Sequence, residues 1–77
     1  MDQFHKEHRI HASADQNPET KYWIPRAVVS WDENGTHHVQ PLDGPPDRFQ
    51  TDVEATSFAA VLGTKWIDDG KPDLKRS

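Results

Sequence analysis

The last third of the chain carries the clearest hydrophobic pattern, with apolar residues at helical spacing. The residues that share one face at 100° per residue are Ala55, Phe58, Ala59, Leu62 and Trp66. Thr51 and Glu54 have the spacing of a capping box, which starts a helix, and Gly70 suits the position just after a helix end. The pattern predicts one helix that begins within two residues of Asp52 and ends within two residues of Asp69.

Residues 22–32 follow a polar stretch and are rich in β-branched and aromatic side chains, which favours a strand. The positions on one face are Trp23, Pro25, Ala27, Val29 and Trp31, and those on the other are Tyr22, Ile24, Arg26, Val28 and Ser30. Pro25 cannot donate a ladder hydrogen bond. We therefore expect the early part of this strand to lie at a sheet edge or a bulge.

The pair Asn34-Gly35 signals a β-hairpin, and two loop lengths can be compared. A two-residue loop would place Val29 opposite Gln40, whereas a three-residue loop over 33–35 would place Val29 opposite Val39. Apolar residues tend to match across a ladder, so the pattern favours the three-residue loop.

The remaining segments complete a predicted α+β fold. A loop over 41–47 leads to residues 48–50, which add a possible third strand before the helix. We predict a small antiparallel sheet of two to three strands (β-β-β-α), with the C-terminal helix packed on one face. Residues 1–21 read as a polar, disordered tail, 22–70 as the single domain and 71–77 as a polar C-terminal tail. The predicted core consists of Ala27, Val29, Trp31, Val39, Phe49, Phe58, Leu62 and Trp66.

Composition narrows the class of protein. The 77 residues include no cysteine, which excludes disulfides and thiolate zinc sites. A net charge of -4 argues against a phosphate backbone as the main partner. No apolar run approaches a membrane span, and the first residues lack the apolar core of a secretory signal. These features predict a cytoplasmic protein without a membrane partner.

Three segments resemble small, mostly uncharacterised bacterial proteins. The segments are 22–27 (YWIPRA), 49–55 (FQTDVEA) and 66–70 (WIDDG), which match a strand ending F-x-T, a helix beginning x-x-E-A and a closing W-I-D. The likeness covers about residues 22–70. One relative in this group, the haemolysin-activator HlyU type, is linked to transcriptional control, but it has Arg-Ala-Asp where this chain has residues 48–50, RFQ. The resemblance implies a fold and supplies no catalytic residue.

Candidate chemistry is sparse. His5, His8 and His11 are three residues apart, which leaves a metal-binding tail as an alternative. On a helix, however, their side chains would spread over about 120°, and no acidic residue has ligand spacing. The acidic pairs 32–33 and 68–69 are sequence neighbours, whereas catalytic carboxylates converge in an apolar pocket. We therefore predict no enzyme activity, no cofactor and no metal site.

The favoured function is a non-enzymatic interaction domain that acts through protein contacts. One helix covers only one sheet face, so the opposite face is the predicted partner surface, with residues Tyr22, Ile24, Arg26 and Val28. The expected partner is a second copy in a weak homodimer, or another protein. The alternative is a nucleic-acid-linked regulatory module, which a continuous basic stripe from Arg26, Arg48 and Lys65 would support.

Overall fold

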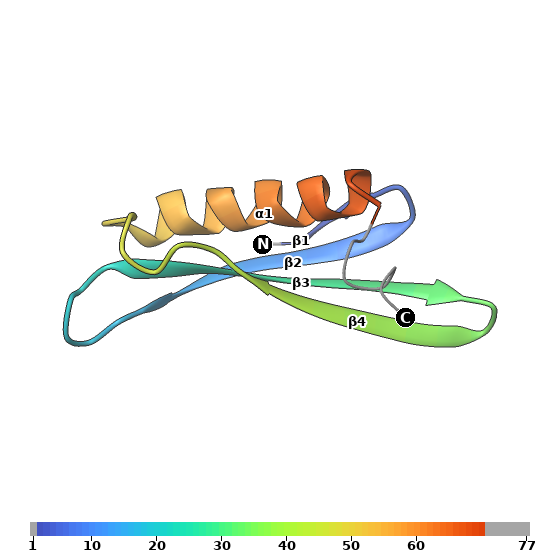
Figure 1. Ribbon diagram of the computed structural model, residues 1–77, viewed down its shortest axis with the longest axis horizontal. Helices are drawn as coiled ribbons and strands as arrows, with labels where there is room; N and C mark the ends of the chain where they lie inside the picture. Colours follow the sequence, from blue (N-terminus) through green and yellow to red (C-terminus); the bar gives the residue numbers. More distant parts are fainter. Residues whose placement is uncertain (1, 71–77) are drawn as a thin grey trace.

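The computed structural model describes residues 2–70, which form an antiparallel sheet and one helix. The elements are β1 (Asp2–His5), β2 (His8–Gln16), β3 (Trp23–Glu33), β4 (Thr36–Asp43) and α1 (Asp52–Asp68). The strands lie in the order β1-β2-β3-β4, with α1 across one face (Figure 1). The predicted α+β class is confirmed, but the sheet has four strands rather than two to three.

The prediction of a disordered N-terminal tail is wrong for residues 2–16, which form β1 and β2. Ile10 and Ala12 are buried against the helix, with 0% and 1% of their surface exposed, while the neighbouring residues Arg9 and His11 are exposed. This is the period-2 alternation of a half-buried strand. It is hard to see in the sequence because alanine fills the inward positions after Ile10.

The segment between β2 and β3 is an ordered loop rather than the end of a tail. The Asn17 N–H donates to the Tyr22 carbonyl at 2.9 Å, and the Lys21 N–H donates to the Asn17 carbonyl at 2.8 Å. The folded body therefore extends from β1 to Gly70, and the predicted domain boundary at residue 22 falls inside it. The predicted tail over 71–77 lies outside the described residues.

The β3–β4 hairpin has a two-residue loop, so the predicted three-residue loop is wrong. Glu33 pairs with Thr36, and Val29 lies opposite Gln40. Asn34 and Gly35 have φ values of 54° and 80°, the positive angles of the primed turns whose twist matches the strands. Turn geometry therefore outweighed the matching of apolar side chains, and Val39 lies away from the helix, 55% exposed.

Pro25 is fully buried in β3, an inner strand, and not at the edge or bulge that was expected. In an antiparallel ladder, alternate residues direct their backbone groups to opposite neighbours. Pro25 directs its carbonyl to Gly44, whose N–H donates to it at 2.9 Å just after β4 ends. The missing N–H of Pro25 therefore falls where the β3–β4 ladder is already finished.

The predicted helix is confirmed at both ends. Thr51 is the N-cap, and its hydroxyl oxygen accepts the Glu54 N–H at 3.2 Å. The Thr51 hydroxyl also donates to the Glu54 carboxylate at 3.2 Å, a side-chain contact between the two capping-box residues. Gly70 has a φ of 87° and returns its N–H to the Ile67 carbonyl, as expected for a residue after a helix end.

The core lies between α1 and the strands β2 and β3. It contains two clusters: Ile10, Val29, Trp31, Trp66 and Ile67; and Ala12, Ala27, Ala59 and Ala60. The helix approaches closely, since a Cβ added at Gly63 would lie 2.7 Å from Cγ2 of Ile10. The predicted core members Phe49, Phe58 and Leu62 are only partly buried. The expected third strand over 48–50 is reduced to one bridge between Trp23 and Phe49.

Candidate functional site

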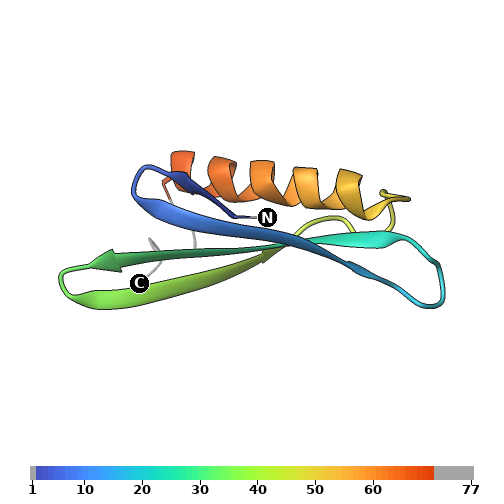
Figure 2. The same ribbon diagram turned by 180° about the vertical axis from the view of Figure 1, so that it is seen from behind.

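The helix covers one face of the sheet and leaves the other uncovered, as both views of the ribbon show (Figures 1 and 2). Strand alternation and register assign these residues to the uncovered face, called here the open face: Asp2, Phe4, Arg9, His11, Ser13, Asp15, Ile24, Arg26, Val28, Ser30, Asp32, His37, Val39, Pro41 and Asp43. Three of the four predicted partner-surface residues, Ile24, Arg26 and Val28, belong to it. The fourth, Tyr22, precedes β3 and lies in the β2–β3 loop.

Apolar side chains from three strands lie on the open face, with Val28, Pro41 and Val39 as neighbours and Arg9 and Arg26 between the other members. Phe4 of β1 is 75% exposed and Val39 of β4 is 55% exposed, while Ile24 and Val28 of β3 are half-buried. Val28 lies directly opposite Pro41. We call Phe4, Ile24, Val28, Val39 and Pro41 the apolar strip. Sequence reasoning missed Phe4, Val39 and Pro41, and the Asn34-Gly35 turn was the signal that could have placed the last two.

The arginines of the open face are paired with carboxylates on neighbouring strands. Arg26 of β3 bridges Asp15 of β2 and Asp43 of β4, with Nε 2.6 Å from Asp15 Oδ2 and Nη1 3.1 Å from Asp43 Oδ1. Arg9 of β2 lies 3.3 Å from the Asp2 carboxylate of β1. These ion pairs link all four strands across the same face.

Two histidines of the open face are also paired with aspartates. His11 hydrogen-bonds to the Asp2 carboxylate, and this bond, helped by the charge of Arg9, holds the pKa of Asp2 below its ordinary value. His37 Nδ1 lies 2.9 Å from Asp32 Oδ1. With the arginine pairs, these contacts largely compensate the charged groups of the open face within the chain.

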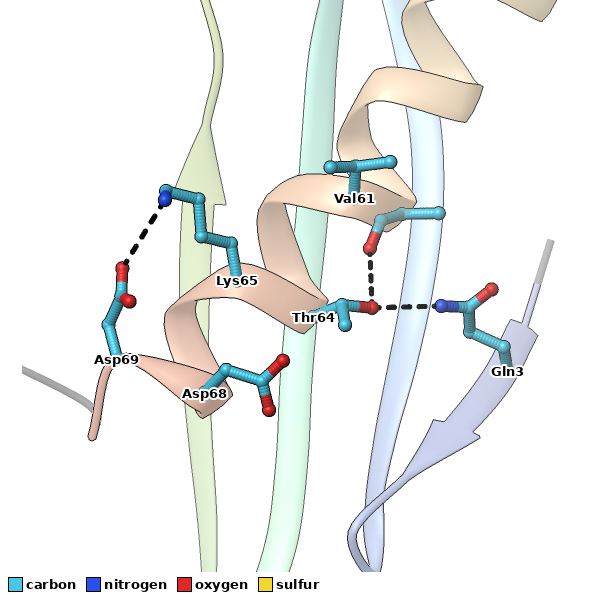
Figure 3. Close-up of a pocket in the computed structure, with 7 residues that line it drawn as sticks. Gln3, Val61, Thr64, Lys65, Asp68 and Asp69 are labelled. Carbon is cyan, nitrogen blue, oxygen red and sulfur yellow. Dashed lines mark hydrogen bonds and ion pairs between the residues drawn. The ribbon is translucent and has the colours of Figure 1, made fainter.

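A hollow of about 410 Å³ lies on the helix side of the molecule, beside the C-terminal half of α1 (Figure 3). It is lined by Gln3, Ala60, Val61, Thr64, Lys65, Asp68 and Asp69. The Gln3 amide donates to the Thr64 hydroxyl at 3.1 Å, and that hydroxyl donates to the Ala60 carbonyl at 3.0 Å. Its polar groups are engaged with each other or, for Asp68, with His5 and Lys6, so it offers little that is free to bind a ligand.

Asp68 joins the helix to the turn between β1 and β2. Its carboxylate lies 2.8 Å from His5 Nε2 and 2.9 Å from Lys6 Nζ. An acidic residue near a helix C-terminus is unfavourable, and these two partners offset that effect. The hydrogen bond from His5, followed by that from Lys6, holds the pKa of Asp68 below its ordinary value of 3.8.

This contact predicts a pH-dependent effect of Asp68→Asn. A carboxyl whose pKa is lowered by folding adds stability above its ordinary pKa of 3.8 and loses it as the pH falls through the lower, folded value. An asparagine side chain cannot ionise, so the variant should be less stable than wild type at pH 7, and the difference should vanish in acid. Urea midpoints across this range measure it. Asp69→Asn is the control, because the Asp69 carboxylate is 4.0 Å from Lys65; an equal effect there would contradict the prediction.

The histidines of the N-terminal segment do not converge. His5 and His8 are a cross-strand pair, but the His5 ring contacts the Asp68 carboxylate and the His8 ring lies 5.2 Å from the Trp31 ring. His11 lies on the open face. Among residues 2–70, no group of three or more His, Cys, Asp or Glu side chains could hold a metal ion. The metal-binding alternative therefore has no support from the described residues.

The basic residues of the nucleic-acid alternative lie in different parts of the molecule. Arg26 is on the open face between two carboxylates. Lys65 is an exposed residue of α1, on the other layer, and lies 4.0 Å from Asp69. Arg48 precedes the helix, with its guanidinium 6.0 Å from the Phe49 ring. The three do not form the continuous stripe that would support this alternative.

Comparisons with known proteins assign the chain to no family. No protein-family model, curated protein or solved structure matched the chain. Within residues 2–70, no helix combines the length and the apolar character needed to cross a membrane.

Proposed function

We propose that this chain is a non-enzymatic interaction domain that acts through protein contacts on the open face, with a second copy of the chain as the partner. The observation that carries the proposal is an exposed apolar strip on a sheet face that the single helix leaves uncovered. Such a strip is unfavourable in water by about 25 cal/mol per Å² of apolar surface, so covering it favours association.

The charges around the strip support burial against a like surface. Arg26 and Arg9 are already paired with carboxylates of the same chain. A surface that compensates its own charges does not need an oppositely charged partner when it loses water, and a second copy meets that condition. In such an interface the paired groups would lie among the apolar side chains, and each arginine would keep a carboxylate partner from its own chain.

The size of the open face is also adequate. Strands lie about 4.8 Å apart and rise about 3.3 Å per residue, so four strands of roughly eight residues cover about 500 Å² in projection. With side-chain relief this approaches the ~800 Å² per partner of a standard interface. Two copies would pack sheet against sheet at about 10 Å, with their helices outside.

The outer edge of β4 discourages open-ended association by strand pairing. Gln40 and Leu42 pair toward β3 by the alternation of the ladder, so Pro41 between them faces the outer edge. Proline at such a position removes an outward donor and blocks further strands. A closed face-to-face dimer is therefore favoured over a growing sheet.

An enzymatic role has no support from the open face. Its carboxylates are exposed and paired with arginine or histidine side chains, whereas a general acid needs an apolar environment that raises its pKa. The pKa of Asp2 is instead lowered by His11. A nucleic-acid partner is opposed by the net charge of -4 and by the separation of Arg26, Arg48 and Lys65.

Val28→Lys tests the proposal, because Val28 is on the apolar strip opposite Pro41. We expect wild type to show a rising average mass in sedimentation equilibrium at high micromolar concentration, reversible on dilution. Val28→Lys should remain monomeric, since it brings an unpaired charge into the interface. Val61→Lys, at a 62% exposed valine on α1, should behave as wild type. A strictly monomeric wild type, or a Val28→Lys protein that still associates, would refute self-association on this face.

A further inference from the structure

The turn between β1 and β2 has an unfavourable sequence for its shape. Lys6 and Glu7 form a two-residue loop with φ values of 50° and 64°. Side-chain-bearing residues other than Asn and Asp adopt this left-handed region only at a cost. The β3–β4 hairpin makes the same kind of turn with Asn34-Gly35, which suits it. The first hairpin is therefore closed by a strained turn.

The strand held by this turn has no buried side chain. The four residues of β1 are alternately exposed and half-buried. Apart from its ladder with β2, β1 contacts the helix through polar groups: Gln3 with Thr64 at 3.1 Å and His5 with Asp68 at 2.8 Å. A β1 strand from another copy can make all these contacts, because its sequence is identical.

We propose that β1 is exchanged between two copies of this chain. In the exchanged dimer the Lys6-Glu7 turn opens, so that β1 and β2 of one copy become a single long strand. Each β1 then pairs with β2 of the other copy in the register seen within one chain, in which Phe4 lies opposite Arg9 and His5 opposite His8. Short hinge loops under strain are known to favour such swapping.

The charges of the hinge residues fit this exchange. The β1–β2 register pairs His5 with His8, so its next step places Lys6 opposite Glu7 of the second copy. The two-fold axis creates two such pairs, and opposite charges directly across an antiparallel ladder are stabilising. Among residues 2–70, Glu7 has no ion pair in the closed form, whereas Lys6 gives up its contact with Asp68. Opening thus relieves two strained residues in each chain, and the two Lys6–Glu7 pairs of the dimer replace the two Lys6–Asp68 pairs that are lost.

This exchange is independent of the open-face dimer. The exchange moves β1 with Phe4 but leaves β3 and β4, which carry the rest of the apolar strip, in place, so a face contact through Val28 can form with or without it.

A cysteine pair across the β1–β2 ladder distinguishes the two arrangements. Phe4 and Arg9 are directly opposite and, since the closing pair His5–His8 is hydrogen-bonded, form a non-hydrogen-bonded pair whose spacing of about 4.5 Å suits a disulfide. The chain contains no other cysteine. In Phe4→Cys/Arg9→Cys, oxidation joins one chain to itself in the closed form and two chains to each other in the swapped form. The matched control is Asp32→Cys/His37→Cys, the same position in the hairpin with the favourable turn.

The experiment is refolding at high concentration under oxidising conditions, read by non-reducing gel and by mass. We expect a covalent dimer from Phe4→Cys/Arg9→Cys and only covalently closed monomer from Asp32→Cys/His37→Cys. Adding Lys6→Asn/Glu7→Gly to the first pair should lower the dimer yield at least tenfold, because the turn is no longer strained. Adding Glu7→Lys should also lower it, because Lys6 would then face a second lysine, on the other copy.

The outcomes separate this inference from the open-face proposal. Covalent dimer that survives Val28→Lys supports exchange even if the open-face contact fails. Covalently closed monomer alone at all concentrations, or a dimer yield unchanged by the Asn-Gly turn, would overturn exchange while leaving the open-face dimer standing.

Discussion

Trp66→Ala should lower the free energy of unfolding by about 3–5 kcal/mol, the usual cost of removing a large buried aromatic side chain. Trp66 is 7% exposed, and its ring lies 5.7 Å from the Trp31 ring in the cluster that also contains Ile10 and Val29. It is the largest side chain that the helix contributes to this cluster. Its loss would leave a cavity that the surrounding backbone cannot close.

The effect should be large relative to the total stability. A chain of this length has a free energy of unfolding of about 4–12 kcal/mol. Urea unfolding followed by far-ultraviolet circular dichroism measures the change. Val53→Ala is the matched control on the same helix, because Val53 is 70% exposed and its truncation should change stability by less than about 0.5 kcal/mol. Equal midpoints for Trp66→Ala and wild type would show that Trp66 is a surface residue.

Ile10→Ala should destabilise the protein by about 2–5 kcal/mol. Ile10 is fully buried, and its Cγ2 occupies the space that the missing Cβ of Gly63 leaves open. It is the point at which the N-terminal segment enters the core, through contact with the helix and with Val29 of β3. Truncation removes this contact from the centre of the helix–sheet packing.

This variant tests whether residues 2–16 belong to the folded body. A disordered tail would contribute nothing, so Ile10→Ala would then unfold at the same urea concentration as wild type. The control is Val39→Ala, an apolar residue in a strand that is 55% exposed, whose truncation should change stability by less than about 0.5 kcal/mol. Comparable losses in both variants would contradict the burial assigned to Ile10.

The helix was predictable because its signals are local. The Thr51 hydroxyl accepts the Glu54 N–H within one turn, and Gly70 adopts the positive φ of the residue that follows a helix end. The apolar stripe has the helical period. Each of these interactions joins residues a few positions apart, so reading the sequence in short windows finds them. The same is true of the strand predicted over residues 22–32 and observed as Trp23–Glu33, in which alternation assigned residues 23–31 to the correct faces.

The hairpin register shows where local signals compete. Matching Val29 with Val39 favoured a three-residue loop, but Asn34 and Gly35 both adopt the positive φ values of a two-residue turn. The turn determines the register because the backbone conformation of its two residues constrains the whole ladder, whereas one matched apolar pair adds at most about 1 kcal/mol. This choice moved Val39 to the open face and so changed the candidate site.

The site was only partly predictable. Alternation alone places Ile24, Arg26 and Val28 on one face, and this part of the prediction agrees with the strand register. Phe4 joins them only because β1 pairs with β2. Likewise, the position of Arg26 between Asp15 and Asp43 depends on three strands meeting, which no reading of the segments one by one reveals.

Local chemistry in the sequence was thus enough to define α1, its caps and the two faces of β3. Tertiary packing, however, decided that β1 and β2 belong to the folded body. Ala12 and Gly63 have no strong local preference that marks them, but their small size lets the helix approach the sheet closely. The strained Lys6-Glu7 turn has the same origin: long-range contacts of β1 hold two residues in a conformation that their own side chains disfavour. Contacts between residues far apart in the chain outweigh local preference where many act together.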